Sequence, residues 1–394
     1  MSAPALLAAP VNGIGFPRDV RPRPSRIVEL DGLRALAIIP VILHHCWPSG
    51  SWTSFVGEAG WMGVDLFFVL SGYLITGILL NASGVRNGYR NFLARRALRI
   101  FPLYYVCLAL FTAAAVLRSD HASWEAMKAW GGVGWFVVYL GNIHAAWTNS
   151  LPPVLSFATL WSLQVEEQFY LLFPLAVALL SMRNLRRFLI GCAIAAPLLR
   201  SSMVLFAPHH PEAAYVLMPC RMDALAMGAI LAILVRTGAL PRASQARFSF
   251  LVSGAITAAI FCAALRHGNT AYDPWMRSVG YSAVDFTCVS LLCWILLSPS
   301  SVLTRTLRLG PLVYAGQIAY GLYLLHEPAS WIARRLLGHV ALHSALSVPI
   351  TFAASFIAAG LSWRFLESPF LAWKGRLPMR ESMHVRLSGS QAGP

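Results

Sequence analysis

The sequence is poor in charged side chains. Only 12% of its 394 residues are Asp, Glu, Lys or Arg, whereas 57% are hydrophobic, and the mean hydropathy is +0.61. A soluble domain of this length has a more polar composition, so a soluble protein is excluded. The composition is typical of a polytopic membrane protein, for which we predict an all-α fold.

Acidic residues are scarcer than basic ones, with 16 Asp and Glu against 31 Lys and Arg and a net charge of +15. In a membrane protein, short basic loops set the orientation, so this excess requires no nucleic-acid partner. The seven cysteines are scattered in or beside apolar runs, and no pair has zinc-ligand spacing with histidines. We therefore expect no disulfide framework and no metal, and interpret the cysteines as small core residues.

Ten apolar runs are long enough to span a bilayer. They lie near 33–47, 62–80, 100–117, 161–181, 188–206, 220–236, 248–265, 281–298, 311–330 and 346–366. An eleventh run, near 133–148, is short and polar at its end. If it does not span, most Lys and Arg residues fall on the same side as both termini. The positive-inside rule therefore favours about ten transmembrane helices, cytoplasmic termini and an interfacial or re-entrant 133–148 segment.

The two ends of the sequence differ from this body. Residues 1–25 lack the basic start of a signal peptide and are followed by Pro- and Arg-rich sequence, which predicts a disordered cytoplasmic tail. Residues 371–394 are predicted to form a basic cytoplasmic tail, which leaves a membrane domain over residues 26–370. Both tails are too short and too polar to fold alone.

The stretch RALAIIPVILHH is apolar except at its two ends. Arg34 and His45 are 11 positions apart, so in a helix they lie about three turns apart on nearly the same face. The rise separates them by roughly 16 Å, about half the hydrocarbon core. Arg34 alone could simply snorkel to an interface. Because titratable groups inside a span usually face a cavity or a partner, the shared face favours a functional site.

Titratable side chains gather at the predicted outer ends of several spans. Asp65 begins the second span near the end of the first, where its carboxylate could fix the tautomer of His45 and raise its basicity, as a general base requires. Each group also has a structural interpretation, such as a helix cap or a first-turn carboxylate. The set comprises His44, His45, Asp65, Glu166, Glu167, His326 and Glu327. Two further pairs are interpreted as structural: Arg221 with Asp223, and Arg364 with Glu367.

Basic residues cluster at the predicted inner mouth of the third span. Arg96 and Arg99 are three apart in NFLARRALRIFPLYY and share a helix face. They could be an ordinary positive-inside anchor. They could equally form a phosphate clamp, because arginine binds phosphate bidentately, and Arg34 could join it.

Seven stretches, in this order, resemble the signature stretches of the acyltransferase-3 family. These membrane-bound O-acyltransferases acetylate O-antigen, exopolysaccharide, nodulation factors and macrolides. The resemblance covers essentially residues 26–370. The stretches are RIVELDGLRALAIIPVILHHC, GWMGVDLFFVLSGYLIT, FLARRALRIFPLYY, LWSLQVEEQFYLLFP, CRMDALAMGAILA, IAYGLYLLHEP and WRFLESPF.

The resemblance implies roles for individual residues. The family's arginine and histidine, separated by ten residues, match Arg34 and His45, which selects His45 over His44 as the catalytic imidazole. The family's basic motif matches Arg96 and Arg99, which implies contact with a cytoplasmic acyl-CoA donor, acetyl-CoA by default, and no metal. Some members carry a C-terminal esterase-like domain. This chain shows none, so we expect it to deliver the acyl group to the acceptor itself.

The resemblance and the residues together predict transfer of an acyl group, acetyl by default, to a hydroxyl of an extracytoplasmic carbohydrate or glycolipid. The enzyme would lie among the lipids of the inner or plasma membrane. His45, oriented by Asp65 or by Glu167, which matches a family carboxylate, would act as a general base or first take the acyl group itself. The alternative is a transporter or flippase of a lipid-linked sugar, which predicts an internal repeat that the sequence does not show. The sequence does not indicate the oligomeric state.

Overall fold

A computed structural model describes residues 27–47, 54–82, 87–117, 122–268, 270–337 and 347–377. Within these ranges the chain forms helices and no strand, so the predicted all-α fold is confirmed. The predicted tail at 1–25 and the greater part of the one at 371–394 lie outside the described residues.

The longer helices are α1 (Val28–Cys46), α3 (Met62–Ala82), α4 (Gly88–Val116), α9 (Trp161–Leu179), α10 (Met182–Phe206), α12 (Met218–Thr237), α13 (Ala243–Ala264), α14 (Tyr281–Leu297), α17 (Ala319–Leu337) and α18 (Ser347–Ser362). The shorter helices are α2 (Ser54–Glu58), α5 (Ala122–Trp130), α6 (Gly134–Val137), α7 (Gly141–Thr148), α8 (Leu155–Ala158), α11 (Pro211–Val216), α15 (Val302–Leu307), α16 (Gly310–Gln317) and α19 (Ser368–Ala372). The 3-10 segments are η1 (Leu265–His267), η2 (Thr270–Tyr272) and η6 (Trp373–Arg376), and the π-helical segments are η3 (Met276–Gly280) and η5 (Trp363–Glu367).

Seven helical segments of the described chain are long and apolar enough to cross a membrane. They contain α3, α4, α10, α12, α13, α14 and α18. The predicted spans at 33–47 and 161–181 lie in α1 and α9, whereas the predicted span at 311–330 is divided at Ile318 between α16 and α17. Helices α1, α9 and α17 have 19 residues each, and each carries charged or titratable residues within its apolar sequence. The structure thus confirms a multi-pass helical membrane protein, while the count of ten spans stays a prediction.

Residues 133–148 do not form one helix. The chain is broken between α6 and α7 at Tyr139, whose φ of 59° is left-handed. The ring of Tyr139 stacks on Tyr104 of α4 with centroids 4.3 Å apart, and the Tyr104 hydroxyl donates to the carbonyl of Phe136 over 2.8 Å. Since 8 helical residues span about 12 Å against a core of about 30 Å, this segment does not cross a bilayer, as predicted.

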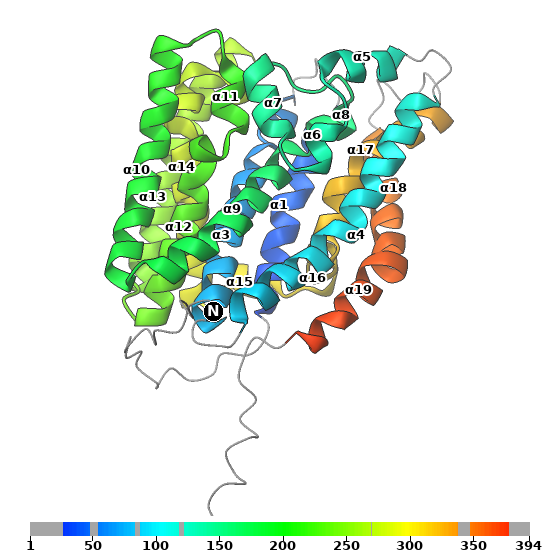
Figure 1. The fold of residues 1–394 in the computed structure, drawn as a ribbon. Coiled ribbons are helices and arrows are strands. Elements are labelled where there is room, and N and C mark those ends of the chain that lie inside the picture. Colours follow the sequence, from blue (N-terminus) through cyan, green and yellow to red (C-terminus); the bar gives the residue numbers. More distant parts are fainter. Residues whose placement is uncertain are drawn as a thin grey trace, which may run out of the picture.

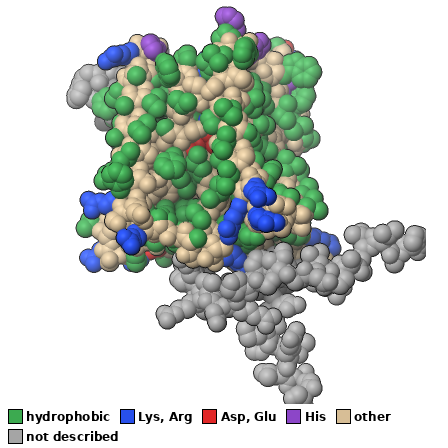
Figure 2. Space-filling view, turned by 90° about the vertical axis from the view of Figure 1, so that its left-hand side faces the viewer, with side chains coloured by type: hydrophobic (Ala, Val, Ile, Leu, Met, Phe, Trp, Pro, Cys, Tyr) green, Lys and Arg blue, Asp and Glu red, His purple; other side chains and the backbone are tan. Residues whose placement is uncertain are grey.

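The helices form one bundle with two distinct ends (Figure 1). Helix α1 runs through its middle, from the end that carries α15, α16 and α19 to the end that carries α5, α7 and α11. Helices α3 and α12 are mostly buried, whereas α10 and α13 are mostly exposed and largely apolar. Figure 2 shows a broad apolar face with Lys and Arg gathered mainly along its lower edge. Such a face fits contact with lipid.

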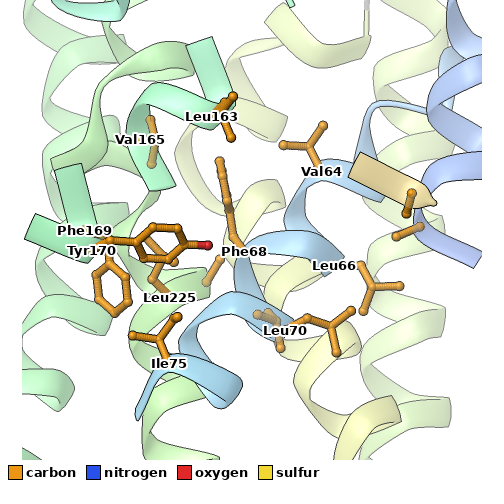
Figure 3. Packing of buried hydrophobic residues seen from close by; sticks show 14 of the residues in the cluster. Val64, Leu66, Phe68, Leu70, Ile75, Leu163, Val165, Phe169, Tyr170 and Leu225 are labelled. Atoms are coloured by element: carbon orange, nitrogen blue, oxygen red, sulfur yellow. The ribbon is translucent and has the colours of Figure 1, made fainter. Parts of the chain in front are cut away.

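Helices α3 and α12 approach each other closely through two glycines. A Cβ on Gly72 would overlap the carbonyl oxygen of Leu225, and a Cβ on Gly228 would overlap that of Val69. Small residues at this contact let two membrane helices pack backbone to backbone. Around them, apolar side chains of α3, α9 and α12 converge in the core (Figure 3).

We predict that Gly72→Val destabilises the bundle, because the branched side chain has no space beside the backbone of Leu225. Overpacking of this kind costs at least about 1–3 kcal/mol. The control is Gly191→Val in α10, where an added Cβ meets nothing within 4 Å. Thermal unfolding of the two purified variants in detergent measures the difference. Equal melting temperatures would show that the close approach does not hold the helices together.

Candidate active site

One cavity is lined by the three arginines that the sequence singled out. Arg34 reaches it from α1, and Arg96 and Arg99 reach it from α4. We call it the arginine cavity, and it holds about 800 Å³ of space free of protein atoms. The remaining lining is Val64, Phe67, Phe68, Ser71, Leu74, Ile75, Ile100, Ser162, Leu163, Glu166, Tyr170, Ala319, Tyr320 and Tyr323. The predicted grouping of the arginines is therefore present.

Neighbouring side chains hold these arginines in place. Arg34 pairs with Asp31 over 2.9 Å. The guanidinium carbon of Arg96 lies 5.3 Å from the ring centroid of Tyr170, within cation–π range. The facing carboxylate is Glu166, which accepts hydrogen bonds from Ser71 over 2.7 Å and from Tyr170 over 2.9 Å. Because three guanidinium groups and only this one carboxylate line the cavity, it keeps a surplus of positive charge that suits an anion.

Glu167 lines neither this cavity nor the histidine cavity described below. Neighbouring positions on a helix point about 100° apart, so Glu166 and Glu167 cannot share one environment. In the part of the chain that the structure describes, no hydrogen bond joins Glu167 to His45, and its Oε1 is buried without a partner. The family resemblance selected Glu167, whereas the glutamate that lines the arginine cavity is Glu166. The sequence feature that favours Glu166 is Tyr170, which lies one helical turn later and donates a hydrogen bond to the Glu166 carboxylate.

A second cavity, the histidine cavity, contains His44 and His45 from the far end of α1. It holds about 1150 Å³ of space, and its aromatic wall is a row of rings: Trp161 and Tyr215 have centroids 4.6 Å apart, and Tyr215 and Tyr272 have centroids 5.2 Å apart. The remaining lining is Glu58, Leu151, Ala158, Thr159, Leu265, Gly268 and Ala271. Aromatic rings with a few polar groups are typical of a small-ligand site.

The two cavities adjoin at Tyr323 of α17. The Tyr323 hydroxyl donates to the carbonyl of Thr159 over 2.7 Å. Its oxygen lies 2.5 Å from the hydroxyl of Ser162, which must therefore be the donor of that bond. Ser162 lines the arginine cavity and Thr159 lines the histidine cavity. The side chain of Tyr323 thus stands between the two.

His45 is half-buried and makes contacts within and across helices. Its Nδ1 lies 2.9 Å from the carbonyl oxygen of Val41 and 3.3 Å from Nε2 of His326 on α17. His44 instead places Nδ1 2.7 Å from the carbonyl oxygen of Gly57. The two adjacent histidines therefore differ: His45 contacts α17, whereas His44 contacts the backbone of α2. From sequence position alone, neither histidine could be selected as the catalytic imidazole.

His45, His326 and Glu327 place possible ligand atoms within 4.8 Å of one another. Imidazole and carboxylate groups are the ligand types of a zinc site, so these three residues could hold a metal. A metal was not expected from the sequence, where spacing along the chain gave no such signal. Because a backbone carbonyl lies within hydrogen-bond distance of Nδ1 in both rings, a metal would have to use their Nε2 atoms.

The predicted role of Asp65 as the partner of His45 is wrong. Asp65 is fully buried and accepts a hydrogen bond from Arg221 of α12. The predicted pair of Arg221 with Asp223 is also wrong, because Asp223 accepts from Arg200 of α10 over 2.8 Å. Positions two apart on a helix do not face each other, so Arg221 and Asp223 turn to different neighbours. These charges join α3, α10 and α12.

The predicted pair of Arg364 with Glu367 is likewise not formed in the described chain. Glu367 is buried and accepts from Ser362 over 3.1 Å, whereas Arg364 is exposed and lies over the ring of Phe365. Both charged residues belong to the π-helical segment η5. Its wider i→i+5 turn changes which positions face each other, so spacing for an α-helix did not apply.

Comparison with known proteins gives a consistent set of matches. The acyltransferase-3 model, described as an acyltransferase domain, matches residues 27–364. Over 371 residues the chain is 31% identical to peptidoglycan O-acetyltransferase OatA of Listeria monocytogenes, covering 89% of this chain and 57% of the relative. It is 31% identical to YrhL of Bacillus subtilis over 372 residues (87% and 54%) and 27% identical to O-acetyltransferase OatA of Staphylococcus aureus over 369 residues (88% and 57%).

The chain therefore spans just over half the length of these curated relatives. No solved structure matches it.

We predict that the buried pair of Asp65 and Arg221 serves stability. Asp65→Leu or Arg221→Met alone leaves an uncompensated buried charge, which costs about 3–5 kcal/mol, whereas the double substitution replaces both charges and recovers much of that loss. Thermal unfolding in detergent measures all three variants. A double variant no more stable than either single one would contradict the pairing, and a stable double variant without transferase activity would restore a catalytic role for Asp65.

Proposed function

Because this chain belongs to the acyltransferase-3 family, we propose that it is a membrane-bound O-acyltransferase that moves an acyl group, acetyl in the first place, from acyl-CoA to a carbohydrate hydroxyl. The observation that carries the proposal is the pair of adjoining cavities, one lined by three arginines and the other containing His45. Relatives named as peptidoglycan O-acetyltransferases support a cell-envelope polysaccharide as the acceptor. A flippase would have no use for this arrangement.

The arginine cavity suits the donor. Arg34, Arg96 and Arg99 can bind the phosphates of CoA bidentately, which lysines in the same place could not do. Beyond them the wall is apolar, with Phe67 and Leu74 among its residues, and can take the pantetheine arm. Since basic residues gather on the cytoplasmic side of membrane proteins, the donor would enter from the cytoplasm.

The acyl group has to pass from one cavity to the other. In our proposal the thioester reaches Tyr323 and Ser162, where the hydroxyl–hydroxyl bond between them has to open. On the far side of Tyr323 lies His326, with ring centroids 6.0 Å apart, and then His45. The acceptor would bind beside His45 in the histidine cavity, so that the acyl group crosses while CoA remains in the arginine cavity.

His45 supplies the proton chemistry. As a general base, its imidazole takes the proton of the acceptor hydroxyl while the oxygen bonds to the acyl carbon. The carbon–sulfur bond then breaks, and the CoA thiolate takes the proton back. Such catalysis contributes about 10²–10⁴-fold in rate. In the covalent variant the imidazole nitrogen first bonds to the acyl carbon while the carbon–sulfur bond breaks and the CoA thiolate leaves. The acceptor hydroxyl then bonds to the acyl carbon, the carbon–nitrogen bond breaks, and the hydroxyl proton goes to the thiolate.

The histidine cavity suits a sugar. The row of Trp161, Tyr215 and Tyr272 offers ring faces, and Glu58 offers a hydrogen-bond acceptor. Of the outer tryptophans considered as sugar-stacking residues, Trp161 lines this cavity, whereas Trp61 is buried beneath it and donates to Thr270 over 3.1 Å.

We predict that His45→Ala lowers acyl transfer by at least about 10²-fold, because the base or nucleophile is lost. The assay is transfer of label from radiolabelled acetyl-CoA to envelope carbohydrate in membranes that contain the protein. His209→Ala, which changes an exposed histidine outside both cavities, is the matched control and should transfer normally. Full activity of the His45 variant would contradict the mechanism.

We also predict that Arg96→Ala and Arg99→Ala each raise the KM for acetyl-CoA about 10- to 100-fold, since a hydrogen bond to a charged group contributes about 1.5–3 kcal/mol. Arg187→Ala is the control, because Arg187 is an exposed residue of α10 that does not line the cavity. Initial rates against acetyl-CoA concentration give the KM. An equal effect of all three substitutions would point to general surface charge rather than a donor site.

A further inference from the structure

The last residues that the structure describes return to the arginines of α4. Helix α19 and the 3-10 segment η6 both pack against α4, and α19 lies at the end of the bundle that carries α15 and α16 (Figure 1). Nη1 of Arg95 donates to the carbonyl of Leu377 over 3.1 Å. This bond fixes the segment to the helix that also carries Arg96 and Arg99, so the segment lies beside the arginine cavity.

Lys374 of η6 stands among positive charges. Its ammonium group is repelled by four guanidinium groups, those of Arg99, Arg96, Arg95 and Arg34. In the residues that the structure describes, no carboxylate forms an ion pair with Lys374. Cations gathered in this way raise the local concentration of anions, and a phosphate group, with several acceptor oxygens, can bind more than one of them.

The arginines of α4 are themselves a group of like charges. Arg95 and Arg99 are four apart and Arg96 and Arg99 are three apart, spacings at which like charges destabilise a helix. An ordinary positive-inside anchor requires only that basic residues lie on the cytoplasmic side. It does not require that a lysine from a distant part of the chain be bound next to them. The arrangement instead fits a site for a ligand with several negative charges.

The proposed donor carries two separate phosphate groups. In acyl-CoA a diphosphate joins the pantetheine arm to the adenosine, and the ribose of the adenosine carries a 3′-phosphate. If the thioester enters first, the diphosphate reaches the arginines that line the cavity, and the adenosine stays at the mouth. Lys374 does not line the cavity and is only partly buried, which is the position expected of a group that binds the outer end of the donor.

We propose that Lys374 binds the 3′-phosphate of the donor, whereas the arginines that line the cavity bind its diphosphate. This assignment rests on the proposed transfer from acyl-CoA. It gives the protein a means of selecting CoA over carriers that present the same pantetheine arm without a 3′-phosphate. The contact lies far from the reacting carbon and is equally strong in the ground state and the transition state, so it affects KM and not kcat.

The test measures initial rates with two radiolabelled donors, acetyl-CoA and acetyl-3′-dephospho-CoA, which differ only in the 3′-phosphate. For the wild type we expect a KM about 10-fold higher with the dephospho donor, because a hydrogen bond between charged groups is lost. Lys374→Met should raise the KM for acetyl-CoA about 10-fold. It should leave the KM for the dephospho donor and both kcat values unchanged.

Three further variants complete the comparison. Lys374→Arg keeps the positive charge and should keep most of the preference for acetyl-CoA. Arg99→Ala should raise the KM for both donors, because both contain the diphosphate. The matched control is Arg376→Met, which removes an exposed cation of the same segment and should leave both KM values unchanged.

The outcomes separate the inference from the proposed function, provided that elution and melting in detergent show folded protein. If Lys374→Met changes the KM of both donors equally, or of neither, while Arg99→Ala raises both, the inference fails and the proposed function stands. A wild type with the same KM for both donors has the same meaning. An equal effect of Arg376→Met would point to general surface charge and overturn the inference. Absence of transfer from acetyl-CoA by the wild type would overturn the proposed function, and the inference with it.

Discussion

A charged side chain inside an apolar bundle must have a partner or face a cavity, and this constraint decides how the helices meet. Arg221 of α12 reaches Asp65 of α3, and Arg200 of α10 reaches Asp223. These bonds tie helices that otherwise meet through apolar side chains and glycines. Arg34, Arg96 and Arg99 face the arginine cavity instead. The first set of charges thus joins helices, whereas the second set is not used to join them and is exposed to the cavity.

The sequence predicted what depends on local pattern. Apolar runs located the long helices, and the spacing of Arg34 and His45 predicted that they lie about three turns apart on one face of α1. That they line two different cavities is a finding of the structure. Arginines three apart on a helix predicted that Arg96 and Arg99 would lie together. These results need only the period of a helix and the preference of charge for a cavity or an interface.

The sequence did not predict what depends on the choice of a distant partner. Asp65 lies near the start of α3, and nothing local shows that it turns to α12 rather than to His45. The choice between Glu166 and Glu167 depends on the rotation of α9 about its own axis, which the neighbouring helices set. The contact between His326 and His45 exists only because α17 packs against α1. In each case tertiary packing, and not helical pattern, decides the contact.

The closure at Tyr323 also bears on the membrane as an electrical barrier. Two cavities that reach toward each other from opposite ends of a bundle would leak ions if they joined, because a water-filled path lets charge cross. The hydroxyl bonds of Tyr323 to Ser162 and Thr159 shut that path with uncharged groups. In the proposed reaction a narrow acyl chain would displace them and fill the opening as it passes. A chemical group would then cross the bundle while the potential across the membrane is kept.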